Sequence, residues 1–152
     1  MATTIKTHVS ELAAVAATLI GLVVYLVNST TGYMAGQGMS VPIIVSSAAA
    51  VVTLAARTFV GDRLPAVLDD ALLVGSEVLL LVGFTQFVLE RVRLAADIYF
   101  IPVNYPASEQ ISLNVALIGV VCYLAAIILL VVKAFTAKDA QHTAIMPEPA
   151  VG

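Results

Sequence analysis

Residues 111–132 read ISLNVALIGVVCYLAAIILLVV, contain no charged side chain, and are followed at once by Lys133. A helix needs about 20 mostly apolar residues to cross the hydrocarbon core of a bilayer. This stretch therefore predicts a transmembrane helix that ends at Lys133, and it is the clearest such signal in the chain.

Three further apolar runs lie N-terminal to it, at residues 12–27, 41–60 and 66–92. The second opens with Val41-Pro42, and proline is well tolerated in the first turn of a helix. Short polar or glycine-rich segments separate the runs, so consecutive helices are expected to reverse direction. The sequence predicts an all-α integral membrane protein, a four-transmembrane-helix antiparallel bundle with helices at about 11–28, 41–60, 66–92 and 111–133.

The composition excludes several classes of protein. The chain has 152 residues, of which 61% are hydrophobic and 11% are charged, whereas soluble domains are about 45–50% apolar and about 25% charged. A net charge of −3 provides no basic surface for a phosphate backbone. We therefore expect contact with the lipid bilayer, no nucleic-acid partner, and no room for a separate soluble domain.

Lysine and arginine are unevenly divided between the two ends of the predicted bundle. The side that would hold both termini contains Lys6, Arg57, Arg63, Lys133 and Lys138, and the other side contains Arg91 and Arg93. Cytoplasmic loops of membrane proteins carry the excess of Lys and Arg. Both termini are therefore predicted to be cytoplasmic, in a bacterial cytoplasmic membrane, with 1–11 a polar N-terminal segment and 136–152 a disordered tail.

Residues that support known catalytic chemistry are scarce. Cys122 is the single cysteine and lies in an apolar run, while His8 and His142 lie in the terminal segments. Membrane haem needs histidines within the helices, and no metal-ligand or nucleophile motif occurs. We expect no cofactor, no metal site and no enzymatic activity.

Glu77 is a carboxylate deep inside a predicted span. A charge at the centre of a transmembrane helix costs about 2.5–3.5 kcal/mol on insertion scales, so Glu77 is expected to be paired, hydrated or protonated. Asp70, Glu77, Phe84 and Arg91 are spaced seven apart and fall on roughly one helical face. This spacing suggests a cytoplasmic half-path for a proton or cation, closed beyond Glu77 by Phe84.

The alternative for Glu77 is an interhelical hydrogen bond. If the second and third helices form a hairpin, Glu77 lies near the level of Ser46 and Ser47, whose small side chains allow close helix approach. The sequence leaves the structural and the proton-handling interpretations open.

The same hairpin gives Arg57 a partner. Arg57 lies one turn from the cytoplasmic end of its helix and can extend toward the interface. It would fall near Asp69 or Asp70, so we expect an interfacial ion pair there, and recognition of an anionic substrate is the alternative.

The segment 94–110, LAADIYFIPVNYPASEQ, is predicted to be a loop on the outer side. Its Tyr99, Phe100 and Tyr105 suit the headgroup region of a membrane. The loop is interpreted either as an interfacial anchor or as a contact for a partner protein.

Three function classes follow from these features. The first is a non-enzymatic accessory or self-assembling subunit of a membrane complex, either a homo-oligomer or a companion of a larger membrane protein. The second is a small proton- or cation-coupled transporter or channel that uses Glu77. The third, a membrane enzyme, lacks a second buried acid near Glu77, because Asp70 is about 10 Å away along the helix.

Overall fold

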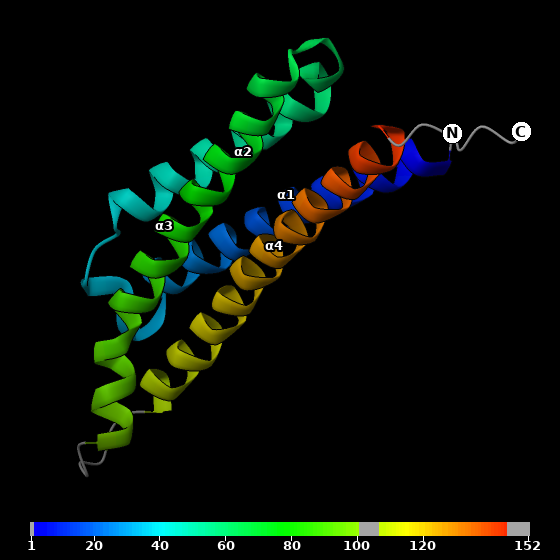
Figure 1. Cartoon of the computed structure of the whole chain (residues 1–152). Helices are drawn as coiled ribbons and strands as arrows, with labels where there is room; N and C mark the ends of the chain where they lie inside the picture. Colours follow the sequence, from blue (N-terminus) through cyan, green and yellow to red (C-terminus); the bar gives the residue numbers. More distant parts are fainter. Residues whose placement is uncertain (1, 101–106, 146–152) are drawn as a thin grey trace, which may run out of the picture.

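The computed structural model describes residues 2–100 and 107–145, with side chains placed for residues 9–61, 63–100 and 107–136. Its elements are α1 (Ala2–Thr30), the short 3-10 helix η1 (Gly32–Gly36), α2 (Val41–Val60), η2 (Gly61–Arg63), α3 (Ala66–Phe100) and α4 (Ala107–Ile145) (Figure 1). Each of the four α-helices is long and apolar enough to cross a membrane. The described chain is therefore all-helical, and the prediction of four potential membrane-spanning helices is confirmed.

The connection between α3 and α4 is shorter than the sequence predicted. A loop was expected over 94–110, but α3 and α4 together occupy most of that range. Leu94 and Ile98 are four residues apart on one face of α3, and they pack with Met34 and Leu113 in a small apolar cluster. This burial favours the helix, so the predicted end of the third helix at residue 92 was too early.

Both ends of the bundle also extend beyond the predicted spans. The backbone is helical from Ala2, and it remains helical from residue 136 to Ile145, where a disordered tail was expected. That stretch, TAKDAQHTAI, contains no glycine or proline, so nothing in it breaks a helix. The remainder of the predicted tail, 146–152, lies outside the described residues.

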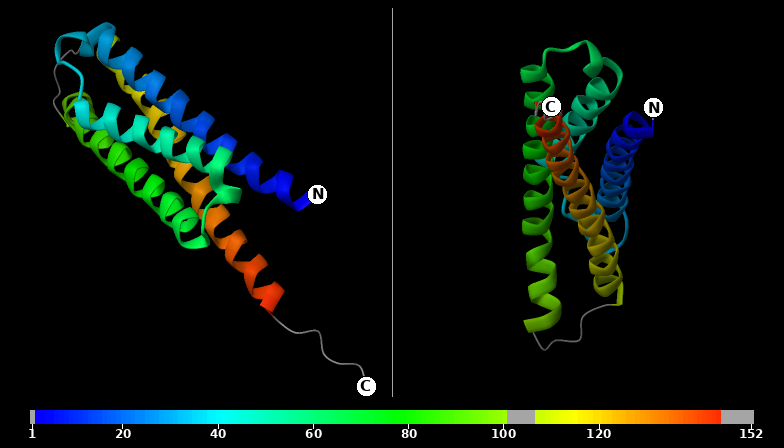
Figure 2. Two further views of the ribbon diagram at one scale, coloured as in Figure 1. Left: turned by 90° about the horizontal axis from the view of Figure 1, so that it is seen from above. Right: turned by 45° about the vertical axis from the view of Figure 1, so that its right-hand side comes forward.

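The four helices form two closely packed pairs. α1 lies along α4, and α2 lies along α3. The two pairs are tilted against each other, as Figures 1 and 2 show, and they meet through contacts of α3 with α4 and of α1 with α2. Side chains from three or four helices therefore converge wherever the pairs meet, and the polar sites described below lie there.

An aromatic column occupies the middle of the bundle. The rings of Tyr25 and Phe87 meet edge to face with centroids 5.2 Å apart, and Phe87 meets Tyr123 in the same manner at 5.9 Å. All three side chains are fully buried. The hydroxyl groups of Tyr123 and Ser47 are 2.6 Å apart and share a hydrogen bond. The column thus links α1, α3, α4 and α2.

Two glycines allow the helices to approach this column closely. A Cβ atom on Gly119 would lie 2.6 Å from a ring carbon of Phe87, and one on Gly21 would lie 2.9 Å from the ring of Tyr123. Both distances are too short for a carbon–carbon contact, so α4 and α1 could not pack as they do with a larger residue at these positions.

The outer surface is apolar on every long helix. Large hydrophobic side chains that are more than half exposed include Val23, Val52, Val74 and Ile118, one from each α-helix. A surface of this kind requires a lipid or protein environment rather than water. The chain is therefore an integral membrane protein whose exterior contacts the bilayer.

Candidate functional site

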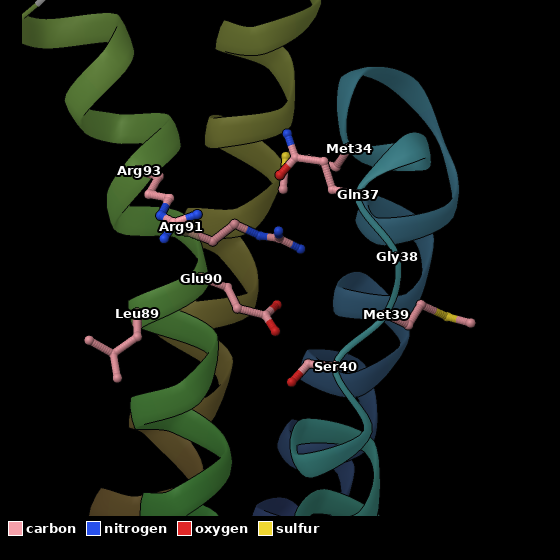
Figure 3. Close-up of a pocket in the computed structure, with 9 residues that line it drawn as sticks. All are labelled: Met34, Gln37, Gly38, Met39, Ser40, Leu89, Glu90, Arg91 and Arg93. Atoms are coloured by element: carbon pink, nitrogen blue, oxygen red, sulfur yellow. The ribbon is translucent and has the colours of Figure 1, made fainter.

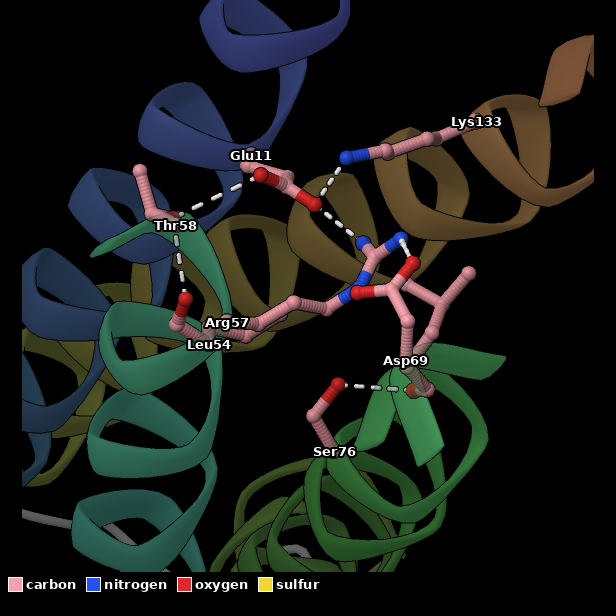
Figure 4. A network of polar contacts seen from close by, with 8 residues as sticks. Glu11, Leu54, Arg57, Thr58, Asp69, Ser76 and Lys133 are labelled. Carbon is pink, nitrogen blue, oxygen red and sulfur yellow. Dashed lines mark hydrogen bonds and ion pairs between the residues drawn. The ribbon is translucent and has the colours of Figure 1, made fainter. Parts of the chain in front are cut away.

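One polar cluster joins all four helices where α2 ends and α3 begins. It consists of Glu11 from α1, Arg57 from α2, Asp69 from α3 and Lys133 from α4, and we call it the four-helix ion cluster (Figure 4). Glu11, Arg57 and Lys133 are 2%, 8% and 7% exposed. Charges this deeply buried are tolerated only when they are paired, and each of them has an oppositely charged partner here.

Arg57 is the centre of this cluster. Its Nε and Nη2 donate to the two carboxylate oxygens of Asp69 at 2.7 Å each, which is the bidentate geometry that favours arginine. Its Nη1 donates to Oε1 of Glu11, and the same oxygen accepts from Nζ of Lys133. With two cations and two carboxylates, the four-helix ion cluster is formally neutral.

The α2–α3 turn positions Arg57 opposite Asp69. Pro65 immediately precedes α3, and its carbonyl accepts hydrogen bonds from the backbone N–H groups of Leu68 and Asp69, which fixes the first turn. A Cβ on Gly61 would lie 3.2 Å from Oδ1 of Asp69, so the connection passes close to the carboxylate. The predicted ion pair of Arg57 is confirmed, with Asp69 as the partner.

The sequence did not reveal that Glu11 and Lys133 complete this cluster. Each stands at the boundary of an apolar run and was taken as a marker of a helix end. The available signal was the complementary sign of four charges at one level of a four-helix bundle. Arg57 and Lys133 thus have carboxylate partners inside the bundle. Their charges are therefore weaker evidence for cytoplasmic termini than a simple count of lysine and arginine suggests.

Glu77 does not reach the serines that were its expected partners. Ser46 and Ser47 lie against Gly83 instead, where a Cβ would be 3.0 Å from both hydroxyl oxygens. Ser47 is bonded to Tyr123, and Ser46 donates to the carbonyl of Ile43 at 3.3 Å. Glu77 is half-buried and makes no hydrogen bond or ion pair with any other residue that the structure describes.

The heptad series around Glu77 does not form a continuous polar face. Asp70 is exposed, Phe84 packs at the edge of the hydrophobic core, and Arg91 is only 6% exposed. A straight helix drifts by about 20° per heptad, so three heptads turn the series from the exterior into the core. Asp70 and Arg91 therefore do not share the environment of Glu77.

A second polar site surrounds Arg91 near the opposite end of the bundle. Nη2 of Arg91 donates to the hydroxyl of Ser29 at 2.9 Å, and the guanidinium carbon lies 5.6 Å from the ring centroids of Tyr25 and Phe87. An arginine over aromatic rings is stabilised by cation–π attraction. The sequence counts Arg91 among the charges on the outer side of the bundle, whereas the structure buries its side chain between helices.

The aromatic residues of the expected outer loop belong partly to α3. Tyr99 and Phe100 form its last turn and are 68% and 83% exposed. Their exposure is compatible with both interpretations of this segment, as an anchor in the headgroup region and as a contact for a partner protein. Tyr105 lies outside the described residues.

The two polar sites are built from ion pairs and hydrogen bonds. Among the described residues, no group of three histidine, cysteine, aspartate or glutamate side chains could hold a metal ion. Comparison with protein-family models, with curated proteins and with solved structures found no match to this chain. Any functional assignment therefore rests on the chemistry of the two polar sites and of the helix surfaces.

Proposed function

We propose that this chain is a non-enzymatic subunit of a larger membrane assembly, and that it associates with its partner through the outward side of α3. It would be an antiparallel bundle with both termini in the cytoplasm of a bacterial cell. After the internally paired Arg57, Lys133 and the buried Arg91 are set aside, Lys6, Arg63 and Lys138 oppose Arg93, which still favours this orientation.

The observation that carries the proposal is three polar side chains on the outward half of α3, with Thr85 near its middle and Glu77 and Gln86 at its opposite edges. Thr85 and Gln86 are exposed and Glu77 is half-exposed, all within the apolar span. None of the three makes a hydrogen bond or ion pair with another residue that the structure describes. Polar groups facing hydrocarbon without partners are costly, and a neighbouring membrane protein would supply the partners.

The four-helix ion cluster supports a fixed scaffold more than a transport path. Its charges are engaged in pairs that hold all four helices, and breaking a buried pair is expensive. A transporter in which the two helix pairs moved against each other would have to break these contacts during each cycle. A rigid body that presents α3 to a partner would not.

Quantitative affinity capture from native membranes tests the association. Glu77→Leu and Gln86→Leu each remove an outward polar group from α3, and Val121→Leu changes an exposed apolar side chain on α4 as the control. Polar contacts between membrane helices contribute about 0.6–2 kcal/mol, so each α3 change should lower partner recovery by about 3- to 30-fold. Equal recovery by all three variants and the wild type would exclude α3 as the contact.

The alternative, a proton- or cation-coupled transporter that uses Glu77, is favoured by one fact: Glu77 has no internal partner among the described residues. Reconstitution in liposomes with a pH gradient separates the two proposals. The subunit proposal expects no flux that differs between wild type and Glu77→Gln. Flux by the isolated wild type that Glu77→Gln abolishes would establish the alternative.

A further inference from the structure

A cavity of about 380 Å³ lies beside the second polar site, between α3 and the segment that leads into α2. Figure 3 shows Glu90 and Arg91 extending from α3 toward the segment that includes Gln37, Gly38 and Ser40, and Arg93 also lines the cavity. Two arginines and one glutamate give this lining a formal charge of +1.

Arg91 lines the wall of this cavity, and one of its buried donors has no partner among the described residues. The side chain is only 6% exposed, and its Nη2 is committed to Ser29. Its Nε is buried and has no hydrogen-bond partner among the described residues. A buried N–H on a charged group loses its hydration without compensation, so the guanidinium of Arg91 is incompletely paired at the wall of the cavity.

The opposite wall is held in place by a short chain of hydrogen bonds. The backbone N–H of Ser40 donates to the hydroxyl of Tyr25 at 2.7 Å, and that hydroxyl donates to Oε2 of Glu90 at 3.3 Å. Glu90 is half-buried, so its second oxygen is available at the cavity for a cation. The cavity thus presents arginine donors and a fixed carboxylate side by side.

The cavity lies where a lipid headgroup would be. It flanks the first residues before α2 and is remote from the four-helix ion cluster, at the level where an apolar span meets water. Met34, Met39 and Leu89 also line it, and the last two are at least half exposed. These residues provide an apolar edge along which acyl chains could leave toward the bilayer.

We propose that this cavity binds the headgroup of an amine-bearing phospholipid. Arg91 and Arg93 donate to the phosphate oxygens, since guanidinium groups match phosphate geometry. Glu90 accepts from the lipid ammonium group, which favours an ethanolamine headgroup over an anionic one. Basic pockets between transmembrane helices bind the phosphate groups of other phospholipids, such as cardiolipin and phosphoinositides.

Titration of the purified full-length chain in detergent with dihexanoyl phosphatidylethanolamine, followed by native mass spectrometry, tests the proposal. Arg93 is exposed, so Arg93→Gln should leave the fold unchanged. It is expected to weaken binding about tenfold, the effect of losing one charged hydrogen bond. Arg63→Gln, an exposed arginine at the other end of the bundle, is the control and should change binding by less than about twofold. Equal binding by both variants would overturn the proposal.

Two further ligands identify the source of the phosphate and the role of the amine. Phosphoethanolamine has the same headgroup without acyl chains, and binding as tight as that of the lipid would replace the lipid with a soluble phosphate ester. Dihexanoyl phosphatidylglycerol lacks the amine and should bind more weakly than dihexanoyl phosphatidylethanolamine. In Glu90→Gln, this difference in affinity should become smaller or reverse. If Glu90→Gln still prefers the ethanolamine lipid to the glycerol lipid by the same factor, Glu90 does not recognise the amine.

Discussion

Replacing Glu11 with glutamine is expected to unbalance the four-helix ion cluster. In the native protein Oε1 of Glu11 accepts from both Arg57 and Lys133, while Arg57 is also paired with Asp69. The variant keeps the shape of the side chain but removes one negative charge. Asp69 would then be the single carboxylate in a cluster with two cations, and Lys133 would lose the carboxylate to which it donates.

The cost of this change follows from burial. Glu11 and Lys133 are 2% and 7% exposed, and removing one partner of a buried ion pair costs about 3–5 kcal/mol. That is a large part of the total free energy of unfolding of a domain, about 5–15 kcal/mol. Glu77→Gln makes the same chemical change at a carboxylate with no internal partner among the described residues, and it should cost less than about 0.5 kcal/mol.

Reversible unfolding in mixed micelles, followed by circular dichroism, measures these differences. The double variant Glu11→Gln/Lys133→Met restores charge balance, because Arg57 and Asp69 remain as a pair. It should therefore be more stable than Glu11→Gln alone, a coupling that a double-mutant cycle isolates. The reasoning fails if Glu11→Gln costs less than about 1 kcal/mol, or if the two changes simply add.

Two other predictions concern the aromatic column. Gly119→Ala should lower the free energy of unfolding by about 1–3 kcal/mol, because the new methyl group overlaps the Phe87 ring. Gly75 is the control, because a Cβ there would have no neighbouring atom within 4 Å. In the same micelle assay, Gly75→Ala should be neutral or stabilising. Tyr123→Phe should cost about 1–3 kcal/mol, because the buried hydroxyl of Ser47 loses its partner, and adding Ser47→Ala should recover part of that loss. Equal stability of the two glycine variants, or no recovery in the serine double variant, would contradict the packing described.

The sequence predicted the helices well because burial in lipid imposes a simple rule. Apolar runs of spanning length predict helices, and the short α2–α3 turn makes a partner for Arg57 predictable from chain geometry. Asp69 could be predicted as a partner because only a short turn separates it from Arg57 in the chain. Local signals of this kind need no knowledge of how distant helices pack.

The sequence could not predict contacts that depend on the register between distant helices. Ser47 lies against Gly83 rather than near Glu77, a shift of about 1.7 helical turns. Arg91 enters the core because the drift of a seven-residue spacing turns it away from Asp70. The meeting of Glu11 with Lys133 depends on how α1 packs along α4, and no local pattern specifies that.

Site-specific photo-crosslinking in native membranes tests the central claim most directly. A photoreactive residue at Thr85, on the exposed side of α3, is compared with one at Ile20, which is 54% exposed on α1. If the chain associates through α3, Thr85 should give a protein adduct of defined mass, and Ile20 should give only lipid adducts. No protein adduct at Thr85, or the same adduct from both positions, would contradict assembly through α3.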